Sequence, residues 1–150
     1  MDKKFTYHAA AHWTLHKRGI VEAGADIPRT INFAAPPEFG GEPGLWTPEH
    51  LWLAAISTCY VATFRAVAEA SKVEIHGLEV AVEGLIEKVE GKYQFTKVTL
   101  RPTVSIVHEQ DYERTGKIIE KAERSCLIAR SISAVMVVEP KIVVEAPVTV

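Results

Sequence analysis

The sequence predicts an α+β fold, and three observations lead to that prediction. The predicted elements follow one another as strands, a long helix, a hairpin, a second helix and final strands, without the alternating units of a doubly wound parallel sheet. The long helix is apolar around nearly its whole circumference, which is typical of a helix in the middle of a fold. The 150 residues, 47% hydrophobic and 24% charged, have the size and composition of one soluble domain, which we assign to residues 1–150.

The N-terminal third is predicted to contain short strands followed by a loop. Apolar residues alternate with more polar ones from Phe5 to Leu15, which predicts a half-buried strand. A turn at Lys17–Gly19 then leads into a second short strand around Ile20–Ala23, and a third is expected over Ile27–Phe33. Pro and Gly are concentrated between Ala35 and Thr47, so this segment is predicted to be a loop.

A single long helix is predicted from Pro48 to Ala70. Thr47 can serve as its N-cap, Pro48 suits the first helical position, and no Gly or further Pro interrupts the segment. Apolar residues lie on almost every side from Leu51 to Val67. Because one modest sheet covers only one side of a helix, we expect a second copy of the chain to cover the rest.

The C-terminal half is predicted to open with a hairpin. Its strands are Leu78–Ile86 and Tyr93–Val107, joined by a turn at Gly91–Lys92. Pro102 cannot donate to a ladder, so we expect it at an edge position or a bulge.

A second helix over Asp111–Arg124 and two short strands, Val135–Val138 and Ile142–Val144, complete the prediction. The helix is amphipathic, and residues spaced three or four apart define its buried stripe. That stripe consists of Tyr112, Thr115, Ile119, Ala122 and Cys126, which places Cys126 at the buried end of the helix.

Composition excludes two classes of function. The formal net charge is −2, without the basic excess that nucleic-acid-binding proteins show. No apolar run is seen to reach the roughly 18 residues that span a bilayer. The polar residues at the start do not resemble a signal peptide. We therefore expect a cytoplasmic protein that binds neither nucleic acid nor membranes.

The six histidines do not predict a metal site. His8, His12 and His16 share one face of a strand, but neighbouring members are about 13 Å apart at a rise of about 3.3 Å per residue. Zinc requires ligand nitrogens about 2 Å from one ion. Motifs for a serine nucleophile or a phosphate-binding loop are also missing. We expect neither a metal nor a bound organic cofactor.

Cys59 and Cys126 are either small buried side chains or a redox pair. Cys59 lies in the middle of the buried helix, where the helix dipole has little effect and burial raises the pKa of a thiol. A reactive Cys59 therefore needs a cation from another element. Arg18, at the tip of the first hairpin, is the better candidate, and Arg29 is the reserve. Glu49 precedes Cys59 by ten residues, about 15 Å along a helix, so it can approach only the cysteine of a partner chain.

The chain resembles the OsmC/Ohr family of organic hydroperoxide peroxidases over nearly its whole length. The resemblance depends on the order and spacing of several short segments. They are Ala11–Trp13, Lys17–Gly19, Pro37–Gly41, the helix start Thr47–Leu51, and the cysteines Cys59 and Cys126. Each segment is weak alone, but their shared order makes the match fairly specific.

The resemblance implies an intertwined homodimer in which antiparallel sheets are wrapped around central helices. It also implies that Cys59 is the peroxidatic cysteine, that Cys126 resolves its sulfenic acid as a disulfide, and that an external dithiol reduces that disulfide. Arg18 would lower the pKa of the Cys59 thiol, and Glu49 would orient Arg18. The catalytic residues predicted in this way are Cys59, Cys126, Arg18 and Glu49.

The chain departs from the family pattern at several positions. Thr47 replaces the usual Asn, Leu127 stands where many members have Pro, and Lys17 remains an alternative to Arg18. Large aromatic residues flank the predicted site and line either a pocket or the dimer core: Trp46, Trp52 and Tyr60. Two alternatives to a peroxidase stay open, namely a binding module with the same fold and a general thiol–disulfide exchanger.

Overall fold

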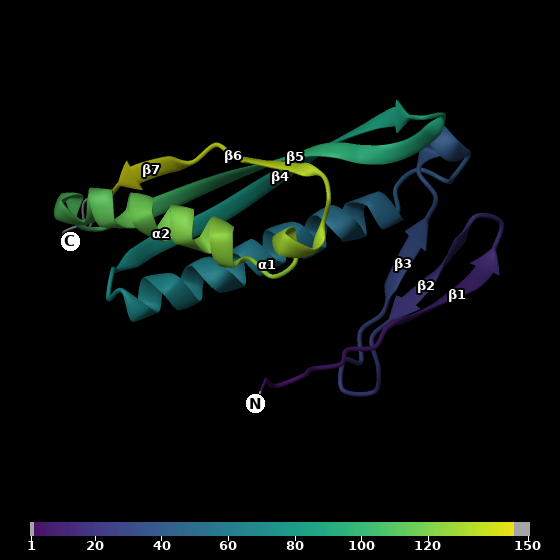
Figure 1. Ribbon diagram of the computed structural model, residues 1–150. Helices are drawn as coiled ribbons and strands as arrows, with labels where there is room; N and C mark the ends of the chain where they lie inside the picture. The colour runs from purple at the N-terminus through teal and green to yellow at the C-terminus, as the bar shows by residue number, and fades with distance from the viewer. Residues whose placement is uncertain (1, 146–150) are drawn as a thin grey trace. The chain divides into compact units, whose positions relative to one another are not determined.

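The computed structural model describes residues 2–145 and contains two compact units (Figure 1). The boundary between the units falls between Trp52 and Leu53, inside the long helix α1, which spans Pro48–Ala70. The assignment of residues 1–150 to a single domain stays a prediction.

The first unit contains a three-stranded antiparallel sheet in the order β1-β2-β3. Its strands are β1 (Ala10–Leu15), β2 (Arg18–Glu22) and β3 (Ile31–Ala34). The three predicted strands are therefore present, but the predicted starts at Phe5 and Ile27 are too early, and the start at Ile20 is too late because Arg18 and Gly19 already belong to β2.

The pairing partners explain why β1 and β3 start late. Ala10 pairs with Glu22, the last residue of β2, so the alternating residues before Ala10 have no strand to pair with. After Glu22 the chain turns, and the Ile27 N–H donates to the Gly24 carbonyl, which delays β3 until Ile31. The side chains of β1 are exposed on both of its faces, so the expected half-buried strand is not found in the single chain.

The predicted loop leads into a helix that starts where the sequence indicates. A short 3-10 helix, η1 (Pro37–Phe39), interrupts the loop. The Thr47 hydroxyl then accepts the His50 N–H at 3.1 Å, and the His50 Nδ1 accepts the Thr47 N–H at 3.2 Å. This reciprocal pair satisfies two backbone donors at the start of α1 and confirms Thr47 as the N-cap.

The second unit contains a mixed sheet in which β5 is the central strand. Its strands are β4 (Ile75–Val89), β5 (Lys92–Ile106), β6 (Val135–Val138) and β7 (Lys141–Val144). β4 pairs with β5 antiparallel, whereas β6 and β7 both pair with β5 in parallel, so the expectation of purely antiparallel sheets needs correction. Glu90 and Gly91 form the hairpin turn with positive φ angles, one residue earlier than predicted.

Pro102 lies in this central strand, so the predicted edge or bulge position is wrong. Its ladder partner in β4 is Val80, without a register shift there. On the other side, β6 pairs with β5 up to Leu100 and β7 from Thr103, so Pro102 lies in the gap between them. The missing N–H of Pro102 therefore falls where no parallel partner requires it.

Two helices lie on one face of this sheet (Figure 1). α1 buries a stripe with a spacing of four residues: Ile56, Tyr60, Phe64 and Ala68. α2 (Tyr112–Ser125) follows the short 3-10 helix η2 (Glu109–Asp111) and buries Thr115, Ile118, Ile119 and Ala122. Tyr112, by contrast, is exposed, which corrects its predicted place on the buried stripe. Cys126 follows α2 and is fully buried, as predicted.

The remaining faces of α1 are only partly covered within one chain. Besides its four buried residues, most side chains of α1 are partly or fully exposed. By length and composition α1 could also cross a membrane, which contradicts the expectation that no apolar run is long enough. The stripe from Ile56 to Ala68 packs within the protein.

Candidate functional site

The second unit brings the two cysteines together. Cys59 comes from the middle of α1, and Cys126 directly follows α2. Both thiols are free; Cys126 is fully buried and Cys59 is partly exposed. The two side chains interact, and this interaction lowers the pKa of Cys59 and raises the pKa of Cys126. Residues that are 67 positions apart in the sequence therefore lie beside each other, and the redox roles that the resemblance implies for them stay predictions.

Backbone N–H groups after α2 point at both sulfurs. The chain forms a helical turn there, in which Arg130 N–H donates to the Cys126 carbonyl at 3.0 Å, followed by the 3-10 helix η3 (Ala129–Ser131). The first N–H groups of such a turn have no partner within it. Those of Leu127 and Ile128 donate to the Cys59 sulfur, and those of Ile128 and Ala129 donate to the Cys126 sulfur.

These contacts set the pKa values of the two thiols in opposite directions. Desolvation acts to raise the pKa of Cys59, but hydrogen bonds from the Ile128 N–H, the Cys126 thiol and other donors outweigh it, so this pKa lies below its usual value. Desolvation raises the pKa of Cys126, and the hydrogen bond to Cys59 and the negative charge there raise it further. Cys59 is therefore the thiol that ionises first.

A side chain one helical turn away completes the surroundings of Cys59. The Thr63 hydroxyl lies 4.0 Å from the Cys59 sulfur and helps to lower the pKa of that thiol. Sequence reasoning did not identify Thr63, although its i+4 spacing on the predicted helix was a usable signal. It also missed the N–H donors of residues 127–129, because backbone donors leave no signal in residue type.

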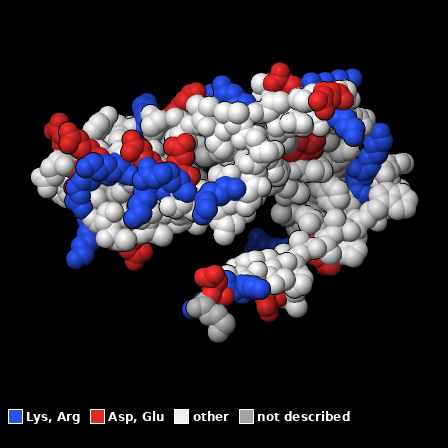
Figure 2. All heavy atoms as spheres, viewed as in Figure 1, with Lys and Arg blue, Asp and Glu red and all other residues white. Residues whose placement is uncertain are grey.

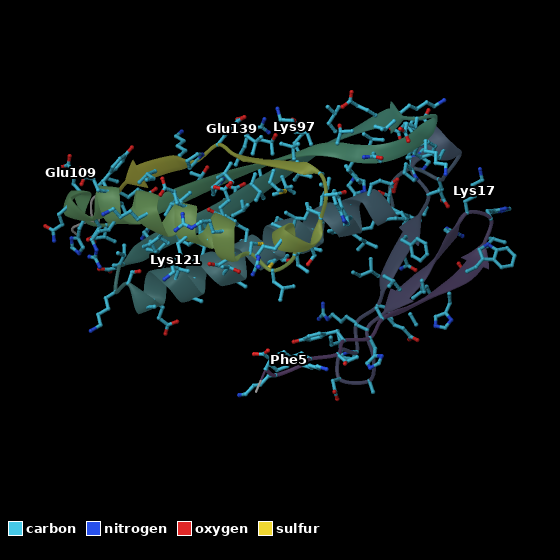
Figure 3. The ribbon with its side chains drawn as sticks, in the orientation of Figure 1. Phe5, Lys17, Lys97, Glu109, Lys121 and Glu139 are labelled. Carbon is cyan, nitrogen blue, oxygen red and sulfur yellow. The ribbon has the colours of Figure 1, made fainter. Side chains whose placement is uncertain are left out.

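The predicted cations lie in the first unit. Arg18 starts β2, and its Nη1 lies 3.1 Å from Oε2 of Glu42. Lys17 precedes it at the tip of the β1–β2 hairpin (Figure 3), and its Nζ donates to the Phe39 carbonyl at 3.1 Å. These residues border an open cavity of about 790 Å³. Arg29 is exposed in the segment before β3.

Glu49 has an unusual environment for a carboxylate. Its Oε1 is buried, and within residues 2–145 it has no hydrogen-bond partner. A buried carboxylate oxygen without a partner is costly. The resemblance implies that Glu49 orients Arg18, but the Arg18 guanidinium forms an ion pair with Glu42 instead. The catalytic roles of Arg18 and Glu49 stay predictions, and the unpartnered oxygen of Glu49 leaves room for an incoming donor.

The three large aromatic residues have different environments. Tyr60 is fully buried, its hydroxyl donates to the Ile119 carbonyl at 3.3 Å, and its ring stacks on Phe64. Trp46 is half exposed, and its ring meets the edge of His50 at a centroid distance of 6.3 Å. Trp52 is partly buried in α1. Tyr60 is thus a core residue, and burial of its hydroxyl raises its pKa well above the usual value.

No group of three or more His, Cys, Asp or Glu side chains within residues 2–145 is arranged to hold a metal ion. Within the same residues, Cys59 and Cys126 form a pair of interacting thiols. Such a pair can be oxidised to sulfenic acid or to a disulfide and reduced again.

Comparisons with known proteins identify relatives over most of the chain. A sequence model of the family described as OsmC-like protein matches residues 41–141. The "Uncharacterized protein YmaD" of Bacillus subtilis (strain 168) is 32% identical over an alignment of 132 residues, and the match covers 84% of this chain and 85% of YmaD.

Solved structures share the fold. An OsmC-like protein of unknown function from Vibrio cholerae matches with a TM-score of 0.82 and 21% identity, covering 91% of this chain and 99% of the other. An organic hydroperoxide resistance protein from Elizabethkingia anophelis matches with a TM-score of 0.75 and 22% identity, covering 97% of this chain and 100% of the other. These matches confirm the predicted α+β fold class.

Proposed function

The chain belongs to the OsmC-like protein family, and we propose that it is a cysteine-based peroxidase that reduces organic hydroperoxides to alcohols. Family membership supports a redox-related role. One observation carries the more specific proposal: Cys59 is a partly accessible thiol whose pKa is lowered, and a second thiol is in hydrogen-bond contact with it. A nucleophilic thiolate beside a resolving thiol is what peroxide reduction requires.

In the first step, the Cys59 thiolate attacks the outer oxygen of the hydroperoxide. The O–O bond breaks, the sulfur becomes a sulfenic acid, and the inner oxygen leaves and takes up a proton to become the alcohol. The N–H groups of Leu127 and Ile128 and the Thr63 hydroxyl hold the thiolate before the attack. They favour the ionised sulfur because their dipoles point at it.

In the second step, the Cys126 sulfur attacks the Cys59 sulfenic acid. The S–O bond breaks, water leaves, and a Cys59–Cys126 disulfide forms. Their hydrogen-bond contact makes this step local and demands little movement of α1 or α2. An external dithiol then reduces the disulfide and closes the cycle.

Arg18 and Glu49 are proposed to assist from outside the thiol pair. Arg18 would stabilise the negative charge on the Cys59 thiolate and on the departing oxygen, and Lys17 and Arg29 are its alternatives. The unpartnered Oε1 of Glu49 supports a role for Glu49 as the residue that orients a guanidinium. Such charge-assisted pairs are stronger than neutral hydrogen bonds.

We also propose that the protein is a cytoplasmic homodimer. The exposed side of α1 supports this, since it carries small and apolar side chains such as Ala62 and Ala66. A second copy packed there would cover the helix on the side that the sheet leaves open.

A thiol count with and without peroxide tests the function. Reduced protein is mixed with cumene hydroperoxide, and free thiols and cumyl alcohol are measured over time. We expect one alcohol for every two thiols lost, and no alcohol from the Cys59→Ser variant. Unchanged thiols would favour a binding module. Exchange with a protein disulfide in the absence of peroxide turnover would favour a general thiol–disulfide exchanger.

A further inference from the structure

A cavity of about 370 Å³ lies beside Cys126 in the second unit. Tyr60 of α1 and Leu100 and Met136 of the sheet form part of its wall, and Cys126 and Ala129 contribute from the segment after α2. Apolar lining and this size suit a small organic molecule. None of the steps assigned to Cys59 above uses this cavity.

Charged side chains of both signs also line the cavity. They are Glu120, Glu123, Arg124 and Arg130. Figure 2 shows Lys and Arg mixed with Asp and Glu over α2 in the same way. Because the charges are balanced, the cavity favours no particular sign of charge in a ligand.

The cavity is in contact with only one of the two cysteines. Cys126 belongs to its wall, whereas Cys59 does not. Thiol–disulfide exchange is a displacement at sulfur, in which the attacking and leaving sulfurs lie on opposite sides of the attacked one. A thiol in the cavity therefore meets a Cys59–Cys126 disulfide at its Cys126 end, with Cys59 placed as the leaving group.

We propose that this cavity is the site where the dithiol reductant binds, and that the reductant attacks the sulfur of Cys126. This inference rests on the proposed function, since it concerns the disulfide formed in that cycle. It assigns different routes to the two reactants: the peroxide approaches the partly exposed Cys59, and the reductant approaches Cys126 from the cavity.

The exchange balances in two steps. First, a thiolate of the dithiol forms a bond to the Cys126 sulfur, the Cys59–Cys126 bond breaks, and Cys59 leaves as a thiolate. Second, the other thiol of the reductant loses its proton, and its sulfur attacks the reductant sulfur that is bonded to Cys126 in the mixed disulfide. The reductant becomes a cyclic disulfide, and Cys126 takes up a proton to become a thiol. Two electrons pass from the dithiol to the protein.

The leaving-group preference agrees with this direction of attack. A thiol with a lower pKa leaves faster in disulfide exchange. The pKa of Cys59 lies below its usual value and that of Cys126 lies above it. The hydrogen bonds from the Leu127 and Ile128 N–H groups are in place to receive the Cys59 thiolate as it departs.

Trapping the mixed disulfide tests which sulfur is attacked. The full-length protein is oxidised with diamide, so that the disulfide forms without peroxide, and is then exposed briefly to the monothiol 2-mercaptoethanol. After acid quenching, peptide mass spectrometry locates the adduct. We expect at least ten adducts on Cys126 for each one on Cys59. A majority on Cys59 would overturn the proposal.

A cavity-filling substitution tests the route. Met136→Trp fills the cavity from β6, and Val135→Trp is the matched control because Val135 is exposed and does not line the cavity. We expect Met136→Trp to slow reduction of the diamide-formed disulfide by dithiothreitol at least tenfold. Oxidation of the reduced protein by cumene hydroperoxide should keep its rate in both variants, and their circular dichroism spectra should match that of the parent protein, which shows that they are folded.

The possible outcomes separate this inference from the proposed function. Equal rates of reduction for Met136→Trp and the parent protein would overturn the cavity route even if peroxide turnover is normal. A Cys126 adduct with slowed reduction in Met136→Trp would uphold it even if cumene hydroperoxide is not consumed. In that second case, the peroxidase proposal alone would fail.

Discussion

The side chains of Cys59 and Cys126 interact, and this interaction lowers the pKa of Cys59, the acceptor, and raises the pKa of Cys126, the donor. The donor must keep its proton, so its pKa rises, while the acceptor is stabilised as a thiolate. In the proposed cycle, Cys59 therefore reacts with the peroxide first, and Cys126 acts only after Cys59 has been oxidised.

We predict that the two thiols are alkylated in a fixed order as the pH rises. Only the thiolate reacts with iodoacetamide, and the pKa of Cys59 is lowered whereas that of Cys126 is raised. Modification of Cys59 should therefore reach its half-maximal rate below the usual pKa of a thiol, and Cys126 only above it. Peptide mass spectrometry at a series of pH values measures both rates. Faster labelling of Cys126 would contradict the assignment of Cys59 as nucleophile.

Substitutions of Cys126 should separate its two roles. Cys126→Ser keeps a donor to Cys59, whereas Cys126→Ala removes it, and neither can form the disulfide. Both variants should stop after one peroxide per chain and accumulate sulfenic acid, which dimedone labelling detects. Only Cys126→Ala should raise the pKa of Cys59, visible as slower iodoacetamide labelling at neutral pH. If the two variants label at the same rate, the hydrogen bond from Cys126 is unimportant.

Leu127→Pro should weaken the Cys59 thiolate without disturbing the fold. Proline lacks the N–H that Leu127 donates to the Cys59 sulfur. Cys126 has φ −65° and ψ 110°, which is the extended backbone that a following proline favours. The Leu127 side chain is exposed, so we expect the free energy of unfolding to change by less than about 1 kcal/mol.

The control for this change is Leu127→Ala, which keeps the N–H. In iodoacetamide labelling at neutral pH, Leu127→Pro should react more slowly than Leu127→Ala, because its Cys59 pKa is higher. Equal rates would show that the N–H of residue 127 contributes nothing. Leu127 stands where many members of the family have Pro, and a proline there would lack this N–H.

The parts of the fold that were predicted well have strong local signals. The helix from Pro48 to Ala70 was predicted with its observed bounds, because Thr47 and Pro48 mark its start and its interior contains neither Gly nor Pro. The strand predicted from Phe5 was too long, because alternation persists where no partner strand is available beyond Glu22. The position of Pro102 depended on a gap between β6 and β7, which only the sheet register shows.

The candidate site was predicted only in part: its two cysteines were identified, but the hydrogen-bond donors around them were not. Cys59 and Cys126 were identified because cysteines are rare in this chain and their spacing resembles a known family. The N–H groups of residues 127–129 could not be predicted, since every residue except proline carries one and only the turn after α2 aims them at the sulfurs. Sequence reasoning looked for a charged side chain, whereas the described donors are backbone dipoles and two side chains.

Arg18→Ala should slow the reaction of Cys59 with cumene hydroperoxide. If Arg18 stabilises the thiolate, its loss raises the pKa of Cys59 and reduces the thiolate fraction about tenfold for each pKa unit lost. Lys17→Ala and Arg29→Ala are matched controls that remove the other two cations and should leave the rate within a factor of two. Stopped-flow measurement of thiol loss checks all three. A slow Arg29→Ala or Lys17→Ala variant beside a normal Arg18→Ala variant would transfer the role to that residue.

Ala62→Arg should convert the proposed dimer into a monomer. Ala62 lies on the exposed side of α1, away from the stripe formed by Ile56, Tyr60 and Phe64. A charged side chain in an interface that covers this helix would be buried without a partner, which is strongly unfavourable. Lys117→Glu, on the exposed side of α2, is the control and should leave the mass unchanged. Light scattering at micromolar concentration measures both masses, and a parent protein with the mass of a single chain would contradict the dimer.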